Sequence, residues 1–153
     1  MVFPEKPDIP VITLVGSTKF PRLWHQAMKD WTLRGYIVHT VGLFGHQEGI
    51  DMSGNVKRML DKVYMRKIEL SDAILVLNED YDGKPYIGMG AWDEIFYAIA
   101  LNKRVVFSKP LKGACKDNLL DLCKLEGWSI PDPVPFRDSK YFQYGGISEI
   151  NPD

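Results

Sequence analysis

The stretch that organises this chain is Gly88-Met89-Gly90-Ala91-Trp92-Asp93-Glu94-Ile95-Phe96-Tyr97-Ala98. Its pattern is that of a glycine turn opening a helix. Ala91, Glu94 and Ala98 share one stripe of that helix, because side chains three and four positions apart stack above one another. Glu94 therefore interrupts an apolar face. A carboxylate in the first turns of a helix, on the face directed inward, is either partnered or functional.

Outward from this stretch, short apolar runs alternate with helical patterns. The runs predict strands at Val11 to Val15, Tyr36 to Val41, Ala73 to Leu77 and Val105 to Phe107. Apolar residues at helical spacing predict helices from Phe20 to Trp31, from Val56 to Ile68, from the quoted glycine turn to Leu101, and from Leu119 to near Gly127. Strands so continuously apolar are expected to be buried on both faces. The order predicts an α/β protein built of βαβ units, with a parallel sheet of four or five strands.

The length of the chain fits one domain. At 153 residues it can bury a core of its own. We expect residues 1–153 to form a single domain with its core at about 11–127. Residues 128–153 carry four prolines with Tyr141, Phe142 and Tyr144, and predict an irregular tail whose aromatic rings pack on the body or on a second subunit.

The composition is that of an ordinary globular protein, with 45% hydrophobic and 25% charged residues. Its 19 basic and 20 acidic residues leave a net charge of -1, so no general field attracts a nucleic acid polymer or a membrane. Met1 to Pro10 lacks the apolar run of a signal peptide, and no stretch of about 18 apolar residues occurs. We therefore expect a cytoplasmic protein whose partners are small molecules or other subunits.

The loops after the first three strands all emerge at the carboxyl edge of the predicted sheet, where ligands bind in folds of this kind. Two of them, from Gly42 to about Gly54 and from Glu79 to Ile87, exceed the usual two to six residues. Long loops of this kind are typical of functional sites. Phe44 and His46 in the first of them could stack on a planar ring.

Gly16, Ser17, Thr18 and Lys19 lie where the first strand gives way to a helix. Backbone amides at such a junction suit a phosphate or a carboxylate, although the same residues also serve as an ordinary helix N-cap. Lys19 and the nearby Arg22 favour the anion.

No cofactor or metal is indicated. The three histidines are scattered and form no pair at ligand spacing. Gly88-x-Gly90 lacks the third glycine of a dinucleotide fingerprint. Asp72, directly before a buried strand, either holds a turn or reaches across the fold toward the site.

Three segments together give the chain a family resemblance. They are Ile-Thr-Leu-Val-Gly-Ser-Thr-Lys-Phe at 12 to 20, Ser71-Asp72 before an apolar strand, and Gly90 to Ala98. In these segments the chain resembles the nucleoside 2-deoxyribosyltransferase superfamily, which also contains the 2'-deoxynucleoside 5'-monophosphate N-hydrolases. The resemblance covers roughly residues 11 to 108.

The resemblance implies a flavodoxin-like or Rossmann-like three-layer sandwich, cleavage of an N-glycosidic bond, and a homo-oligomer. If the roles known in that superfamily apply at the matching positions, Glu94 is the nucleophile that attacks the anomeric carbon of the sugar. Asp72 then helps to hold the base, the sugar or the nucleophile. Gly88, Met89 and Gly90 would line the substrate site. A carboxylate beside the anomeric carbon suits an oxocarbenium-like transition state, and a covalent intermediate divides one hard displacement into two easier ones.

The chain departs from its relatives at Gly88, where several members carry an acidic or hydroxyl residue six positions before the glutamate. The expected reaction passes the sugar of a (2'-deoxy)nucleoside or its 5'-monophosphate to a base. One alternative is transfer to water, as in the N-hydrolases. Others are a non-catalytic nucleotide-binding or interaction module and glycosidic cleavage of NAD.

Overall fold

The computed structural model describes residues 9–41, 53–109, 111 and 113–127. The strands are β1 (Val11–Gly16), β2 (Ile37–His39), β3 (Ala73–Leu77), β4 (Glu79–Tyr81), β5 (Lys84–Tyr86) and β6 (Arg104–Phe107). The helices are α1 (Pro21–Leu33), α3 (Gly54–Glu69), α4 (Met89–Ala100) and α5 (Gly113–Glu126). None of these helices is both long and apolar enough to cross a membrane.

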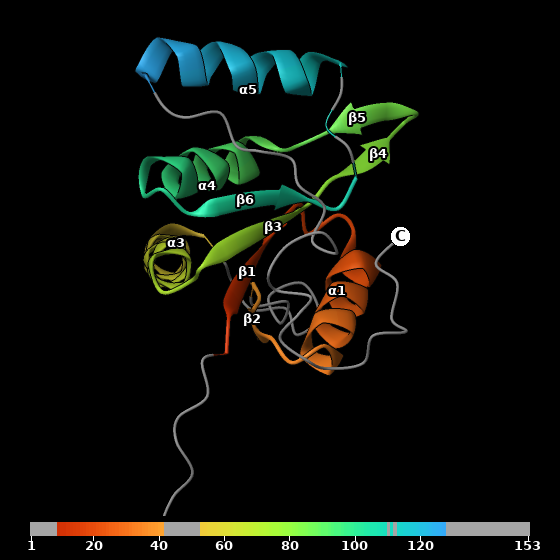
Figure 1. The fold of residues 1–153 in the computed structure, drawn as a ribbon, viewed down its shortest axis with the longest axis vertical. Helices are drawn as coiled ribbons and strands as arrows, with labels where there is room; N and C mark the ends of the chain where they lie inside the picture. Colours follow the sequence, from red (N-terminus) through yellow and green to blue (C-terminus); the bar gives the residue numbers. More distant parts are fainter. Residues whose placement is uncertain (1–8, 42–52, 110, 112, 128–153) are drawn as a thin grey trace, which may run out of the picture.

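The main sheet has four parallel strands in the order β2-β1-β3-β6. Helix α1 covers one face, and α3 and α4 cover the other, with α5 packed beside α4 (Figure 1). The predicted α/β class and the flavodoxin-like three-layer arrangement are confirmed, with four strands in this sheet. Since all four strands run in one direction, the segments that follow them meet at a single edge.

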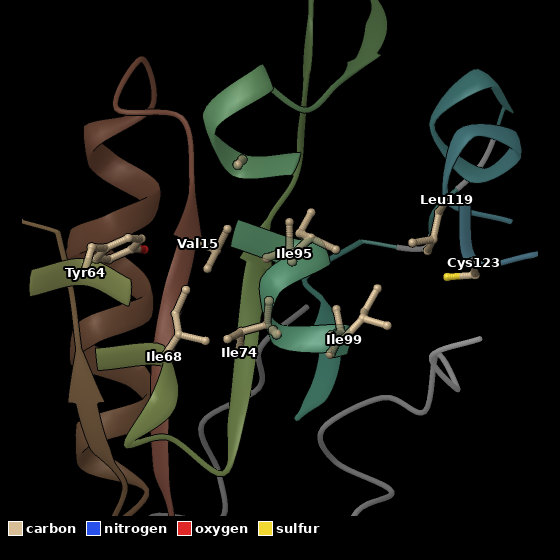
Figure 2. Packing of buried hydrophobic residues seen from close by; sticks show 12 residues of the cluster. Val15, Tyr64, Ile68, Ile74, Ile95, Ile99, Leu119 and Cys123 are labelled. Carbon is tan, nitrogen blue, oxygen red and sulfur yellow. The ribbon is translucent and has the colours of Figure 1, made fainter. Parts of the chain in front are cut away.

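The strand residues alternate between two cores. On the α1 face, Leu14 and Leu75 pack with Trp24 and Trp31 of the helix. On the other face, Val15, Ile74 and Val76 pack with α3, α4 and α5, and Figure 2 shows this second cluster. Strands buried on both faces account for their unbroken apolar sequence. Cys123 is fully buried in the second cluster and packs as a small hydrophobe, as its apolar stripe predicts.

The segment from Glu79 to Ile87 is predicted as a loop from sequence, and this prediction is wrong. It folds into an antiparallel hairpin, β4–β5, whose register pairs Glu79 with Tyr86 and Tyr81 with Lys84. The turn is Asp82-Gly83, with φ of 52° and 73°. Two successive positive φ angles are what a two-residue hairpin turn requires, and Asp-Gly supplies them. The hairpin stands at the carboxyl end of β3, beside the start of α4.

Candidate active site

Glu94 lies in the second turn of α4, the helix that begins at the carboxyl edge of the sheet after its N-cap, Gly88. Ala91, Ile95 and Ala98 of the same helix are buried against the sheet and its neighbouring helices. Glu94 itself is half-buried. It forms no hydrogen bond or ion pair with any other residue that the structure describes. An inward-facing carboxylate in this position is either paired with another group or functional, and no described residue pairs with Glu94.

The surroundings of Glu94 favour its protonated form. Burial raises its pKa to about 8, and the nearby negative charges of Asp61 and Asp93 add to the rise, while Lys57 opposes it. Lys57 and Asp61 come from α3 and form an exposed ion pair at 3.0 Å. Glu94 therefore changes charge near neutral pH, which is the range in which acid, base and nucleophilic roles are tuned.

Tyr64 fixes α3 next to Glu94. Its side chain is buried, and its hydroxyl donates a hydrogen bond to the carbonyl oxygen of Leu14 in β1. Figure 2 shows the ring of Tyr64 directed from α3 toward β1. Burial, and after it the charge of Glu94, raises the pKa of this phenol well above its ordinary value. Tyr64 therefore stays a neutral donor while Glu94 titrates beside it.

A second group of side chains gathers at the same edge, between the β1–α1 turn and the hairpin. The ammonium of Lys19 lies 4.6 Å from the ring centres of both Tyr81 and Tyr86. It also donates a hydrogen bond of 3.3 Å to the hydroxyl of Tyr86. The ring of Phe20 meets both tyrosines edge-on, at centroid distances of 6.5 and 6.3 Å. We call Lys19, Phe20, Tyr81 and Tyr86 the lysine–tyrosine cluster. It holds one fixed positive charge on an aromatic surface.

This cluster explains the glycine at position 88. The backbone of Gly88 is in the ordinary extended region, so no positive φ demands glycine there. A Cβ at this position would instead lie 3.2 Å from the Tyr86 hydroxyl. Gly90, by contrast, has open space around it. The hydroxyl of Tyr86 thus lies where a side chain at position 88 would begin.

The β1–α1 turn is built differently from the simple N-cap that its sequence also allows. The N-cap of α1 is Phe20, and Pro21 is its first residue. Ser17 instead closes the turn: its Oγ accepts a bond from the amide of Lys19, and its carbonyl oxygen accepts bonds from the Phe20 amide and Trp24 Nε1. With these two amides engaged, the positive group that the turn offers a ligand is the Lys19 ammonium.

Gly16 allows the end of β1 to pack closely against β3. A Cβ there would lie 3.1 Å from the carbonyl oxygen of Leu77 in β3. Thr18 and Met89 are exposed, Met89 with 87% of its surface accessible. These residues and Gly90 all belong to the edge that carries Glu94 and the lysine–tyrosine cluster. Phe44 and His46 lie outside the described residues.

Asp72 is not brought to this edge. It precedes β3 at the amino end of the sheet, about 16 Å from the carboxyl edge for a five-residue strand. Its carboxylate accepts a 2.8 Å bond from the Val11 amide, and its own amide donates to the Val11 carbonyl oxygen. The interpretation of Asp72 as a turn-holding residue fits this geometry, and the structure does not pair it with Glu94.

Several residues at the edge were not singled out from sequence. They are Lys57, Asp61, Tyr64, Tyr81 and Tyr86. Lys57, Asp61 and Tyr64 share one face of α3, at spacings of four and three, which the helical pattern could have shown. The tyrosines could have been found from the Asp-Gly turn between them, since it places their strands side by side.

Within the described residues, no three His, Cys, Asp or Glu side chains gather in a way that could hold a metal ion. What this edge does contain is a titratable carboxyl, Glu94, and a fixed positive charge on an aromatic surface, the lysine–tyrosine cluster.

Comparisons with known proteins leave the function open. No protein-family model and no curated protein matches the chain. Among solved structures, the chain is similar to FerB, a flavoenzyme NAD(P)H:(acceptor) oxidoreductase from Paracoccus denitrificans. The two are 17% identical over 88% of this chain and 79% of that one, with a TM-score of 0.43. A likeness of this degree carries no argument about what this chain does.

Proposed function

We propose that this chain is a nucleoside 2-deoxyribosyltransferase-like enzyme that cleaves the N-glycosidic bond of a (2'-deoxy)nucleoside or its 5'-monophosphate. The observation that carries the proposal is Glu94: a half-buried carboxyl at the ligand-binding edge, with a pKa raised to about 8 and no partner among the described residues. The sequence resemblance assigns the nucleophile to the same residue.

In the first step, a carboxylate oxygen of Glu94 bonds to the anomeric carbon as the bond from that carbon to the base breaks. The electron pair of the broken bond leaves with the base nitrogen, which takes up a proton from solvent. In the second step a nitrogen of an acceptor base attacks the same carbon, Glu94 leaves as a carboxylate, and the acceptor loses its proton. With water in place of the acceptor base, the same two steps give hydrolysis.

The raised pKa supports this role in a specific way. A nucleophilic carboxylate must be ionised, and with a pKa of about 8 roughly one tenth of Glu94 is ionised at pH 7. A poorly solvated carboxylate is also more reactive than one surrounded by water, because no hydration shell has to be displaced. Asp72 is left out of the mechanism because it lies at the opposite edge of the sheet.

The test is to incubate the protein with each natural deoxynucleoside and its 5'-monophosphate, with and without an acceptor base, and to follow free base by chromatography. We expect release or exchange in the native chain and its loss in Glu94→Gln. Glu126→Gln, an exposed glutamate of α5, is the matched control and should behave like the native chain. Exchange without hydrolysis selects the transferase, and base release without an acceptor selects the N-hydrolase.

Three outcomes would contradict the proposal. Base release that survives Glu94→Gln would show that another group is the nucleophile. Calorimetric binding of a nucleotide that is unchanged in Glu94→Ala, with no turnover of any substrate, would instead identify a non-catalytic nucleotide-binding module. Release of nicotinamide from NAD, with no action on deoxynucleosides, would assign the site to a different substrate.

A further inference from the structure

The hairpin β4–β5 lies outside the main sheet and is held there by side chains. Among the described residues it hydrogen-bonds to no strand of that sheet, and it projects beyond the carboxyl ends of β3 and β6 (Figure 1). Residues 80–84 of the hairpin are exposed. A two-stranded hairpin by itself is only marginally stable in water. Its direction relative to Glu94 therefore depends on the side-chain contacts at its base, where the chain leaves β3.

Asn78 is the single residue between the end of β3 and the start of β4. Its side-chain amide forms three hydrogen bonds, all of them with the two residues that follow β6. The Oδ1 atom accepts a bond of 3.2 Å from Ser108 Oγ and one of 3.1 Å from the Lys109 amide. The Nδ2 atom donates a bond of 3.0 Å to the Lys109 carbonyl oxygen. One planar group thus ties the ends of two neighbouring strands together, and fixes the point at which the hairpin begins.

Lys109 also contacts the hairpin itself. Its ammonium forms an ion pair with Glu79, the first residue of β4. The hydrogen bond from Lys109 lowers the pKa of Glu79, so the pair stays charged near neutral pH. Across the hairpin, Glu79 is paired with Tyr86, whose hydroxyl accepts the hydrogen bond of Lys19. A continuous series of contacts therefore leads from the end of β6 to the lysine–tyrosine cluster.

We propose that Asn78 and Lys109 are positioning residues for substrate recognition. They set the direction in which the hairpin leaves the sheet, and through the hairpin they hold the lysine–tyrosine cluster at the edge that carries Glu94. This inference rests on the proposed function, because it concerns the same site. Neither residue acts on the substrate directly, since both act through the tyrosines of the hairpin. We call the four residues of this network the hairpin anchor: Asn78, Glu79, Ser108 and Lys109.

The two positioning residues contribute unequally. The side chains of Lys109 and Glu79 are 54% and 29% exposed, and an ion pair so open to water stabilises a structure only slightly. Asn78 is half-buried, and its loss would leave the amide and the carbonyl oxygen of Lys109 without their side-chain partner. Asn78 is therefore the main support of the hairpin, and Lys109 adds a smaller constraint on the first residue of β4.

The first test needs no substrate. The NMR signals of the Tyr81 and Tyr86 rings report on the cluster, because each ring lies beside the Lys19 ammonium and the other ring. Asn78→Ala should shift both sets of ring signals, and Lys109→Met should shift them less.

Two further variants are the controls for the ring signals. Lys109→Arg keeps the charge and should resemble the native chain. Lys116→Met, which removes an exposed lysine of α5, should leave the ring signals unchanged. Lys109→Met keeps all three bonds of Asn78, so it decides the matter even if Asn78→Ala fails to fold. Ring signals that do not move in a folded Asn78→Ala or in Lys109→Met overturn the inference.

The second test is steady-state kinetics with the deoxynucleoside 5'-monophosphates. Asn78→Ala should raise KM about three- to tenfold, which corresponds to the partial loss of one binding contact, and Lys109→Met should raise it less. Because Glu94 is not disturbed, kcat and the pH of half-maximal kcat/KM should stay at their native values. Lys109→Arg should restore KM. A lower melting temperature with KM unchanged would show a purely structural role, and a fall in kcat at constant KM would place the defect at Glu94. Either result overturns the inference.

The two tests separate this inference from the function on which it rests. A native chain that turns over no deoxynucleoside and no monophosphate would refute the proposed function. Ring signals that move in Asn78→Ala and Lys109→Met would still support the hairpin anchor in that chain. Turnover that depends on Glu94, together with ring signals that do not move in either variant, would refute the anchor and keep the proposed function.

Discussion

The hydroxyl of Tyr86 lies 3.2 Å from the point that a Cβ on Gly88 would occupy, so the two positions compete for one space. Tyr86 in turn accepts the hydrogen bond of the Lys19 ammonium. The glycine at the N-cap of α4 therefore allows the hairpin to place both a hydroxyl and a positive charge beside the helix that carries Glu94. Substrate preference should depend on this arrangement.

Gly88→Ala should disturb the lysine–tyrosine cluster without unfolding the protein. The added methyl group displaces the Tyr86 hydroxyl by a few tenths of an ångström and lengthens its bond to Lys19. We expect KM to rise about three- to tenfold for the preferred substrate, which corresponds to part of one hydrogen bond. Gly90→Ala is the control, because its Cβ meets open space and alanine favours a helix. Equal effects from both variants would contradict the role of Tyr86.

Lys19→Met tests whether the cluster recognises an anion. Loss of the ammonium should raise KM for a 5'-monophosphate by roughly 10- to 100-fold, as for a charge-assisted contact, and leave the unphosphorylated nucleoside nearly unchanged. Lys29→Met removes an exposed lysine from α1 and should alter neither value. Steady-state kinetics on matched nucleoside and monophosphate pairs gives the ratio. A parallel loss on both substrates would assign Lys19 to packing of the tyrosines.

Glu94 should make the protein less stable as pH rises. Its pKa is about 8 in the folded chain and near 4.5 in the unfolded one, so between these values the folded state holds the extra proton. The free energy of unfolding then falls from about pH 4.5 to about pH 8 and levels off above. Glu94→Gln should therefore melt about 2–5 °C above the native chain at pH 8.5 and close to it at pH 4.5. A constant difference at both pH values would exclude ionisation of Glu94 as the cause.

The charges on α3 should set the pH at which the proposed activity appears. If Glu94 must be ionised for the reaction, kcat/KM rises with pH, reaches half its maximum near pH 8 and levels off above that pH. Asp61→Asn removes a charge that raises the pKa of Glu94, and should lower the pH of half-maximal kcat/KM by roughly 0.3–0.5 pH unit. The shift is small because the ion pair of Asp61 with Lys57 is exposed to solvent. Lys57→Gln should raise the pH of half-maximal kcat/KM, because Lys57 lowers the pKa of Glu94. Shifts of the same sign in both variants would rule out this electrostatic control.

Asp72→Asn should affect folding and spare turnover. The substitution weakens the bond from the Val11 amide at the amino edge of the sheet, and we expect a loss of about 0.5–1.5 kcal/mol in the free energy of unfolding. Urea denaturation measures the loss, and kcat of the variant at saturating substrate should match the native value. A large fall in kcat at unchanged stability would return Asp72 to the catalytic group.

Much of the fold could be predicted because its strands and helices carry unambiguous periods. Ala73 to Leu77 is apolar at every position, and the structure buries all five residues. The position of Glu94 on α4 could be predicted from the same periodicity. The side chains that act on it could not, since they come from other segments: Asp61 is 33 residues earlier in the chain, a separation obtained as 94 minus 61. Only the packing of α3 on α4 brings the two together.

The hairpin was missed for a different physical reason. Glu79, Asp80 and Asp82 dominate its composition, and acidic residues are depleted in strands. The turn geometry of Asp82-Gly83 outweighs that preference, because a tight turn fixes the register of both arms. In the same way Ser17 looks like a helix cap in sequence, yet Pro21 fixes the start of α1 and leaves Ser17 to close the turn before it.

The hairpin β4–β5 hydrogen-bonds to no strand of the main sheet among the described residues. It is inserted between β3 and α4, where a direct connection of two to six residues would suffice. Its length and its tyrosines can therefore change in evolution while the four parallel strands and Glu94 keep their places. Under the proposed function, a change of substrate would then require replacing only the eight residues Glu79–Tyr86, and the folding of the core would be unaffected.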